Sequence, residues 1–496
     1  MPCNRLRVAG ASWLALNLLV AIGVSPAVGQ EFTGVQAAAA LEDVLVKAIA
    51  QAERSVVAIA RVNRNSAEAR GDTAPNFFNR LRSQDAAGPG DPGFIPNDYA
   101  TGVVVGDGLI LTAHHVLREE SEYWVTTADR KTYKVAKILG ADPRSDLAVL
   151  QIPAADLVPI KFGDATKLKK GQIVIALGNP YAIARDGQAS ASWGIVANLA
   201  RKDAPTISQR DEGPAATKPA LHQYGALIQT DAKLNLGTSG GALINLKGEM
   251  VGLTVALAAS LGYEQSAGFA LPVDETFLRA LKTLRQGREV EYGLLGVEIS
   301  GLPPADRARG KHGVFVADVK AGTPADRAGL LPQDLITHID DQEIHEPDEL
   351  MLHIGKLPAD GSARITVDRA GRTQVIPVHE LSKYWVQGKK IVTDQPPAWR
   401  GIRVDYVTAS PDFSRGTLQS RVDAHGSVLV TEVEEGSPAW KEGLRPNMMI
   451  SHVGGVSVTT PKQFRQEVSG KQGPVRLRLS VRPSERPERT IPPDAG

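Results

Sequence analysis

A serine flanked by glycines, in the run Gly-Thr-Ser-Gly-Gly at residues 237–241, constrains this chain more than any other feature. The run lies between short apolar segments and begins eight residues after Gln229. A Ser hydroxyl is a weak nucleophile at neutral pH, so it needs a His as general base and a carboxylate that orients the His. If Ser239 is a nucleophile, the fold must bring both partners to it from elsewhere in the chain.

Two upstream motifs supply the candidate partners. An apolar run that starts at Leu109 ends in His114 and His115, and segment 142–146 carries two Asp before the apolar run 147–152. Taken singly, paired histidines are often surface residues, and an Asp before a strand is often a turn cap. Together the motifs follow the order His, Asp, Ser, each beside an apolar strand, which predicts a catalytic triad of the chymotrypsin type. The α/β-hydrolases have a different order of catalytic residues, and their Gly-x-Ser-x-Gly motif does not match residues 237–241, which read Gly-x-Ser-Gly-Gly.

The neighbours of each candidate select one residue per motif. Adjacent residues in extended or turn backbone point in different directions, so only one His can face Ser239, and we select His115, which directly precedes an apolar Val. Asp142 precedes a Pro, so we expect it at an exposed corner. Asp146 leads into an apolar strand, where a buried carboxylate needs an N–H partner such as a His ring. The predicted triad is His115, Asp146 and Ser239.

The glycines beside Ser239 predict an oxyanion hole in the loop Gly237, Thr238, Ser239. Backbone N–H groups must approach the oxyanion without obstruction from side chains, which favours Gly at position 237. The N–H groups of Gly237 and Ser239 are the predicted donors.

Residues 229–253 resemble the nucleophile region of the HtrA/DegP-like serine proteases. The segments 178–180 and 268–272 resemble the same family, and the His and Asp motifs match it in register at His115 and Asp146. The resemblance covers nearly the whole mature chain. It implies a mainly β fold, with a chymotrypsin-like double β-barrel protease domain followed by two PDZ domains. It also implies an endopeptidase that cleaves unfolded or damaged proteins outside the cytoplasm and assembles as a trimer or a multiple of trimers.

Two positions depart from the family pattern. Thr238 stands where the family usually has Asn, and both side chains are short and polar. Lys233 lies six residues before Ser239, where the family usually carries a small or aliphatic residue at the floor of the specificity pocket. Either the long stem of Lys233 turns out to solvent, or it faces the pocket and favours an acidic residue before the cleaved bond.

An internal repeat organises the second half of the chain. Residues 322–339 align with residues 436–453 at an offset of 114, and each copy resembles the centre of a bacterial PDZ domain. PDZ domains bind peptide C-termini as an added strand, with a Gly-flanked loop on the terminal carboxylate. In the first copy this loop is predicted at Gly293, Leu294, Leu295 and Gly296. In the second it is predicted at Arg400, Gly401 and Ile402, but the Arg replaces an apolar residue, so that copy either binds peptide or serves only in packing.

The amino terminus resembles a secretory signal. Arg5 and Arg7 precede the apolar segment 8–24, and small residues follow at the positions that a signal peptidase reads. The only cysteine, Cys3, lies inside this predicted signal at 1–29, so the mature chain has no disulfide, which suits the periplasm. An uncleaved membrane anchor is the alternative. The predicted domains are a signal peptide at 1–29, a protease domain at 30–280, PDZ domains at 288–380 and 399–483 with a linker at 381–398 between them, and a disordered tail at 484–496.

Composition and motifs narrow the remaining classes of function. The chain has 56 basic and 55 acidic residues, so nucleic-acid binding is not expected. His338 and His452 recur at equivalent positions of the repeat, but no further ligand shares their spacing, so neither a metal site nor a cofactor is predicted. No P-loop is present, which indicates an ATP-independent enzyme. The alternative is a non-proteolytic chaperone or PDZ scaffold that uses the protease fold to bind chains.

Overall fold

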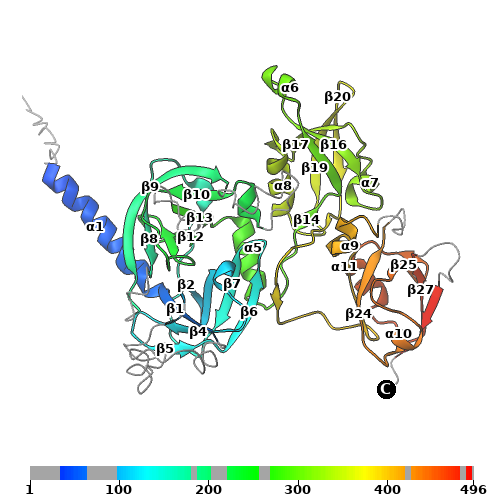
Figure 1. Ribbon diagram of the computed structural model, residues 1–496, viewed down its shortest axis with the longest axis horizontal. Helices are drawn as coiled ribbons and strands as arrows, with labels where there is room; N and C mark the ends of the chain where they lie inside the picture. Colours follow the sequence, from blue (N-terminus) through cyan, green and yellow to red (C-terminus); the bar gives the residue numbers. More distant parts are fainter. Residues whose placement is uncertain are drawn as a thin grey trace, which may run out of the picture. The chain divides into compact units, whose positions relative to one another are not determined.

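The computed structural model describes residues 34–63, 96, 98–179, 187–202, 220–255, 268–418, 426–480 and 488–493 (Figure 1). Within these ranges the chain is built mainly of antiparallel strands, which confirms the predicted mainly β class. The predicted signal peptide at 1–29 lies outside the described residues. None of the described helices is long and apolar enough to cross a membrane.

The first helix, α1 (Gly34–Ala52), is divided between two compact units. Residues 34–44 belong to the first unit, and all of their side chains are exposed. Ala48 and Ala52 belong to the second unit and are buried in its main core, because small side chains one helical turn apart share a face. A 3-10 turn, η1 (Glu53–Ser55), then leads into the first strand.

An eight-stranded antiparallel sheet follows, in the order β22-β6-β7-β3-β2-β1-β4-β5. Strands β3 and β7 are neighbours, with Ala113 opposite Leu147. The end of β3 and the start of β7 therefore lie together. The strands of this sheet are β1 (Val56–Asn63), β2 (Asp98–Gly106), β3 (Leu109–Ala113), β4 (Ser121–Thr126), β5 (Thr132–Lys134), β6 (Lys137–Asp142), β7 (Leu147–Gln151) and β22 (Ile391–Val392).

Six further strands form a closed antiparallel barrel in the order β10-β13-β12-β11-β8-β9. A single apolar core includes Leu111 and Val149 of the first sheet together with Leu177 and Leu253 of the barrel, so the two sheets pack as one body. The barrel strands are β8 (Ile173–Gly178), β9 (Ser190–Arg201), β10 (Leu227–Thr230), β11 (Ala242–Ile244), β12 (Met250–Val255) and β13 (Gly268–Pro272). The 3-10 turns η4 (Ala165–Lys167) and η6 (Leu221–Tyr224) and helix α5 (Glu275–Leu284) accompany them.

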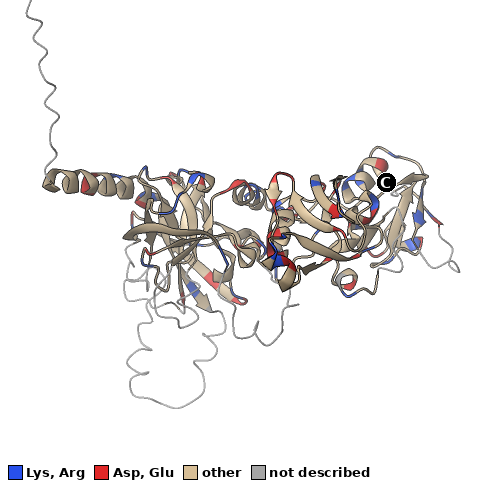
Figure 2. Ribbon diagram, turned by 90° about the horizontal axis from the view of Figure 1, so that it is seen from above, with Lys and Arg blue, Asp and Glu red and all other residues tan. Residues whose placement is uncertain are grey.

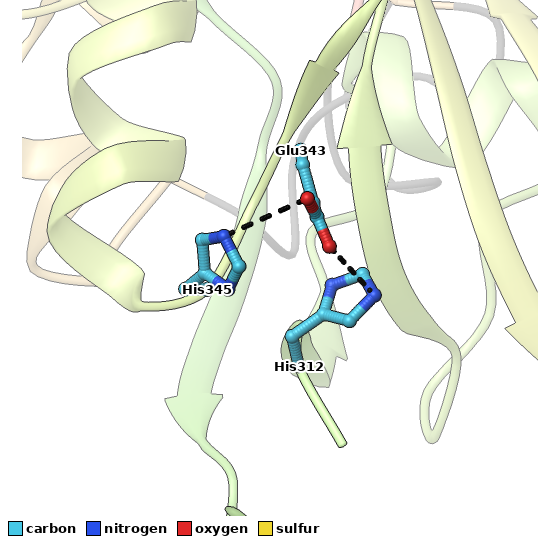
Figure 3. Close-up of side chains that lie close together, drawn as sticks. All are labelled: His312, Glu343 and His345. Atoms are coloured by element: carbon cyan, nitrogen blue, oxygen red, sulfur yellow. Dashed lines mark ion pairs between the residues drawn. The ribbon is translucent and has the colours of Figure 1, made fainter. Parts of the chain in front are cut away.

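The internal repeat folds into two sheets of the same design. Val314 and Val428 are both fully buried in their own cores, as are Ile336 and Ile450. In the first copy, the hairpin β17–β18 lies beside His312 (Figure 3). That copy comprises β14 (Gly293–Leu294), β15 (Val297–Gly301), α6 (Pro304–Ala308), β16 (Val314–Val319), α7 (Pro324–Ala328), β17 (Leu335–Ile339), β18 (Gln342–Glu343), α8 (Pro347–Lys356), β19 (Ala363–Arg369), β20 (Arg372–Val378) and β21 (Ser382–Lys383).

The second copy repeats the strand order as β23-β24-β25-β27-β28, with β26 paired to β25. Its elements are β23 (Ile402–Tyr406), η7 (Val407–Ala409), α9 (Pro411–Ser414), β24 (Val428–Val433), α10 (Pro438–Lys441), β25 (Met449–Val453), β26 (Val456–Ser457), α11 (Pro461–Val468), β27 (Val475–Leu479) and β28 (Glu488–Ile491).

The prediction of a disordered tail is wrong for residues 488–491. They form strand β28, which pairs with β27, and Ile491 is fully buried opposite Val475. The prolines and charged residues around this segment are typical of disorder, so the sequence did not indicate this strand, which lies at the edge of the last sheet. Of the other residues of the predicted tail, the structure describes only 492 and 493.

Positions of Lys and Arg are interspersed with positions of Asp and Glu along the described elements (Figure 2). This distribution matches the near balance of basic and acidic residues in the sequence.

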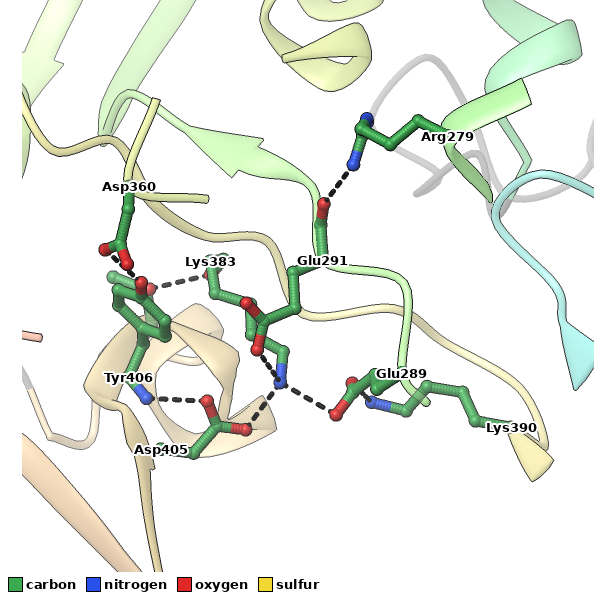
Figure 4. A network of polar contacts seen from close by, with 9 residues as sticks. Arg279, Glu289, Glu291, Asp360, Lys383, Lys390, Asp405 and Tyr406 are labelled. Carbon is green, nitrogen blue, oxygen red and sulfur yellow. Dashed lines mark hydrogen bonds and ion pairs between the residues drawn. The ribbon is translucent and has the colours of Figure 1, made fainter. Parts of the chain in front are cut away.

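A buried lysine joins the segment before β14, strand β21 and strand β23 (Figure 4). Lys383 Nζ lies 2.7 Å from Asp405 Oδ2, 2.9 Å from Glu289 Oε2 and 3.5 Å from Glu291 Oε1, and its side chain is only 3% exposed. Burial alone would lower the pKa of Lys383, but the three carboxylates raise that pKa above its ordinary value. Lys383 therefore stays charged and holds three acidic side chains together.

We expect Lys383→Met to lower the free energy of unfolding by about 3 kcal/mol, since it leaves three carboxylates facing one another in a partly buried site. Because the pKa is raised in the folded state, this stabilisation is complete at neutral pH and is lost only as the pH rises through the folded-state pKa. Urea unfolding at neutral pH measures the change. Lys389→Met is the control, because Lys389 pairs with Glu119 and both side chains are exposed, so its loss should cost less than about 1 kcal/mol. Equal losses in the two variants would contradict this account.

Candidate active site

The two predicted partners of the nucleophile meet where β3 ends and β7 begins. His115 lies in the 3-10 turn η3 (His114–Val116) directly after β3, and Asp146 directly precedes β7. His115 Nδ1 lies 2.8 Å from Asp146 Oδ2, and the backbone N–H of His115 donates to Asp146 Oδ1 at 2.9 Å. The neighbouring His114 instead has its ring Nε2 3.1 Å from the carbonyl oxygen of Lys389. The carboxylate therefore holds both the backbone and the ring of His115.

The environment of Asp146 favours its ionised form. Burial alone would raise the pKa of Asp146, but the charge and hydrogen bonds of His115 and the charge of His222 hold the pKa below its usual range. Its contribution to stability is therefore present at neutral pH and is lost only as the pH falls through the lowered pKa. His222, which is buried in η6, is a neighbour that sequence reasoning missed, because a single His in a polar segment carries no signal of its own.

Asp142 is not at an exposed corner, and this expectation is wrong. Its side chain is buried, and Oδ2 accepts hydrogen bonds from Ser145 N–H at 2.9 Å, from Ser145 Oγ at 2.6 Å and from the Tyr292 hydroxyl. The fully buried Arg144 guanidinium lies 4.1 Å from the centre of the Tyr384 ring. Segments far along the chain thus cover the turn 142–146, which no local pattern could reveal. Asp142 shapes this turn, and Asp146 contacts the His.

Two threonines fix the loop that carries Ser239. Thr101 of β2 donates its N–H to Ser239 O at 2.9 Å and its hydroxyl to Gly237 O at 2.7 Å. Thr254 of β12 donates its hydroxyl to Thr238 O at 2.6 Å. One anchor belongs to the first sheet and the other to the barrel, so the loop is held from both sides. Sequence reasoning missed both residues, since a Thr inside a strand is ordinarily read as a strand former.

Gly240 places the Ser loop against the His-bearing turn. It has φ +84°, and a Cβ there would lie 2.2 Å from Thr101 O and 3.2 Å from Ala113 N. Ala113 is the last residue of β3, immediately before η3. Only Gly allows this approach, which brings Ser239 to the same corner of the fold as His115 and Asp146.

One backbone N–H of the predicted oxyanion loop, that of Thr238, already donates a hydrogen bond within the protein. Gly237 has φ +94°, a left-handed conformation that favours Gly. Thr238 donates both its N–H, at 3.1 Å, and its hydroxyl, at 2.7 Å, to Asn235 O. The N–H of Thr238 is therefore not directed at an oxyanion, which corrects its place among the predicted oxyanion residues. Gly237 and Ser239 remain the predicted donors.

Known protein families match the chain in three segments. The trypsin-like peptidase domain matches residues 100–253, and the PDZ domain matches residues 293–379 and 429–482. A probable periplasmic serine endoprotease, DegP-like, of Chlamydia trachomatis is 30% identical over 378 residues, which are 75% of this chain and 70% of the relative. The protein of the same name from Hahella chejuensis is 31% identical over 423 residues, or 82% of each chain. The chain belongs to the HtrA/DegP-like serine proteases. It is a serine endopeptidase with two PDZ domains, as the sequence predicted.

Two solved protease structures are also similar to this chain. The HtrA-type protease AlgW with decapeptide is 24% identical, with a TM-score of 0.48 over 71% of this chain and 99% of that one. The serine endoprotease from Yersinia pestis is 22% identical, with a TM-score of 0.43 over 70% of this chain and 98% of that one.

In this HtrA/DegP-like chain, Lys233 is exposed, and its backbone N–H donates to Ser192 Oγ at 2.9 Å. Exposure of the side chain agrees with the alternative in which the long stem turns out to solvent. The neighbouring Asp231 accepts the N–H of Ile195 at 2.6 Å, which ties this segment to β9.

The predicted peptide loop of the first PDZ domain is compact. Gly293 and Leu294 pair with β21, and Leu295 is buried in the domain core. Gly296 has φ +92°, and a Cβ there would lie 2.3 Å from Thr323 Cβ, so only Gly fits. The role of this loop in binding peptide stays a prediction.

The corresponding loop of the second PDZ domain differs in one side chain. Gly401 lies against Ser437 as Gly296 lies against Thr323, so Arg400 occupies the position of Leu295. The Arg400 guanidinium is buried and donates to the carbonyl oxygens of Ile491, Lys471 and Gly473 at 2.6 to 2.8 Å. Ile402 is also buried. Their side chains serve the interior of this domain, which speaks against Arg400 and Ile402 as residues that touch a peptide.

Proposed function

We propose that Ser239, His115 and Asp146 are the catalytic triad of this endopeptidase. The observation that carries the proposal is the double contact of Asp146 with the ring and the backbone of His115. With Nδ1–H donated to Asp146, the other ring nitrogen, Nε2, is free of its proton and serves as the general base. It removes the proton of Ser239 as Oγ attacks the peptide carbonyl, and it returns that proton to the leaving amine.

The N–H groups of Gly237 and Ser239 stabilise the oxyanion of the tetrahedral intermediate. The hydrogen bonds of Thr101 and Thr254 support this role, because they fix the carbonyl oxygens of residues 237–239 and thereby the orientation of the loop. Water then attacks the acyl-enzyme with the same His115 as base, and the new acid is released.

The physiological role that fits this chemistry is ATP-independent cleavage of unfolded or damaged proteins in the periplasm. The names of the relatives support this location, as does the signal-like segment at 1–29. The first PDZ domain binds peptide C-termini through residues 293–296, and the second serves mainly in packing. We further propose assembly as a homo-oligomer, a trimer or a multiple of it, on the family resemblance.

Degradation of a permanently unfolded test protein by the mature chain, residues 30–496, without nucleotide tests this function. The native sequence should produce peptide fragments from the unfolded protein, but not from the same protein in its folded form, and Ser239→Ala should produce none. Cleavage that survives in Ser239→Ala would refute the assigned nucleophile. Binding of the unfolded protein without cleavage by either form would favour the chaperone or scaffold.

A further inference from the structure

Two histidines and a glutamate lie close together within the first PDZ domain. His312 lies just before β16, Glu343 lies in β18, and His345 lies between β18 and α8 (Figure 3). His312 Nε2 is 3.0 Å from Glu343 Oε1, and His345 Nε2 is 3.8 Å from Glu343 Oε2. One donor atom from each of the three residues lies within 4.8 Å of the others. The proteolytic mechanism uses none of these side chains.

The spacing of the three donor atoms suits a small metal ion after a modest adjustment. Around a tetrahedral zinc ion with bonds of about 2.0–2.2 Å, neighbouring ligand atoms lie roughly 3.3 Å apart. The donor atoms therefore need to close by at most about 1.5 Å. The side chains of Glu343 and His345 are 50% and 56% exposed, so rotation about their own bonds can supply this movement without repacking the core.

The ring of His312 is held in an orientation that suits a metal ligand. Its Nδ1 lies 3.3 Å from the carbonyl oxygen of Ile344, which directs Nε2 toward Glu343. A ligating His ordinarily donates its second ring N–H to a carbonyl or carboxylate in this way. The ring of His338 packs edge-on against His312 with centroids 5.9 Å apart, and its own Nδ1 contacts the Thr337 hydroxyl.

We propose that His312, Glu343 and His345 bind one divalent transition-metal ion of the zinc class. Two imidazoles and one carboxylate suit zinc, whereas calcium and magnesium prefer ligand sets made only of oxygen. Three protein ligands leave a fourth position for water. The ion ties the segment before β16 to the β17–β18 hairpin and to the start of α8, and so stabilises the first PDZ domain.

The second PDZ domain provides a natural comparison inside the same chain. At the offset of 114 residues, Ser457 stands at the position of Glu343, and Thr459 stands at the position of His345. The position of His338 is again a histidine, His452, which pairs with Ser457 as His338 pairs with Glu343. The repeat therefore keeps the supporting His but carries the carboxylate and the second ligating His only in its first copy. The proposed site belongs to the first PDZ domain alone.

Isothermal titration of zinc chloride into the metal-free mature chain tests the proposal, with thermal unfolding in the presence and absence of zinc as a second readout. We expect one zinc ion per chain and a rise in the unfolding temperature of the first PDZ domain. His345→Ala and Glu343→Gln should each weaken binding by at least about tenfold and remove the thermal shift. His452→Ala is the matched control and should bind zinc like the native chain.

The proposal fails if zinc does not bind, if either ligand variant binds like the native chain, or if His452→Ala weakens binding as much as His345→Ala. It also fails if calcium or magnesium at equal concentration displaces the zinc. Because His345 and Glu343 are exposed, both variants should fold. Their circular dichroism and their unfolding temperatures without zinc should match those of the native chain, which separates loss of a ligand from loss of the fold.

Discussion

Ser239→Ala is expected to lower kcat by about 10⁶-fold, because it removes the hydroxyl that forms the acyl-enzyme and the base then has no proton to remove. The oxyanion donors and the substrate-binding surface remain, so a residual rate of about 10³–10⁴ over water is expected. The fold should not change, since the contacts that fix the loop come from the backbone of Ser239 and from Thr101 and Thr254.

Initial rates on a chromogenic peptide, measured for the native chain and for Ser239→Ala at equal concentration, give this factor. Ser190→Ala is the matched control, because it removes a hydroxyl from an exposed position on β9 and should leave the rate unchanged. A loss of less than about tenfold in Ser239→Ala would show that another nucleophile acts.

Asp146→Asn is expected to lower kcat by about 10⁴-fold with little change in KM. The carboxylate accepts the Nδ1–H of His115 at 2.8 Å, and an Asn amide in its place donates to Nδ1 instead. The imidazole then carries its proton on Nε2 and cannot accept the proton of Ser239. The hydrogen bond from His115 N–H to Oδ1 can persist, so the position of the turn should be kept.

Asp142→Asn separates this effect from general damage to the same turn. Asp142 forms hydrogen bonds with Ser145 and Tyr292 but not with the predicted base. We therefore expect Asp142→Asn to lower the free energy of unfolding, whereas its kcat should fall by less than about tenfold. Steady-state kinetics and urea unfolding of both variants make the comparison. If the Asp142 variant lost as much activity as the Asp146 variant, the carboxylate that orients His115 would be wrongly assigned.

Local signals in the sequence were sufficient to select the His115–Asp146 pair, whose contact the structure shows, and to predict Ser239 as its partner. Ser239 stands among glycines because the left-handed backbone at 237 and 240 favours Gly. His115 was selected because it directly precedes an apolar Val, and Asp146 because it leads into the apolar strand β7, which pairs with β3. The wrong expectation for Asp142 has the opposite cause, since Tyr292, a residue 150 positions away, buries it.

The sequence by itself was sufficient for the mainly β class, the internal repeat and a specific triad to test, because strand patterns, the repeated segment and the order of the His, Asp and Ser motifs can be read along the chain, and the resemblance of those motifs to the HtrA/DegP-like proteases implied the family and its PDZ domains. Only the tertiary structure decided which groups meet across long separations. In the folded chain, Thr101 and Thr254 contact the Ser loop, and the Arg400 side chain is buried within the second PDZ domain. Three carboxylates contact Lys383, and His312 lies beside the β17–β18 hairpin. Such contacts depend on sheet register and packing between distant segments, and no pattern of neighbouring residues encodes them.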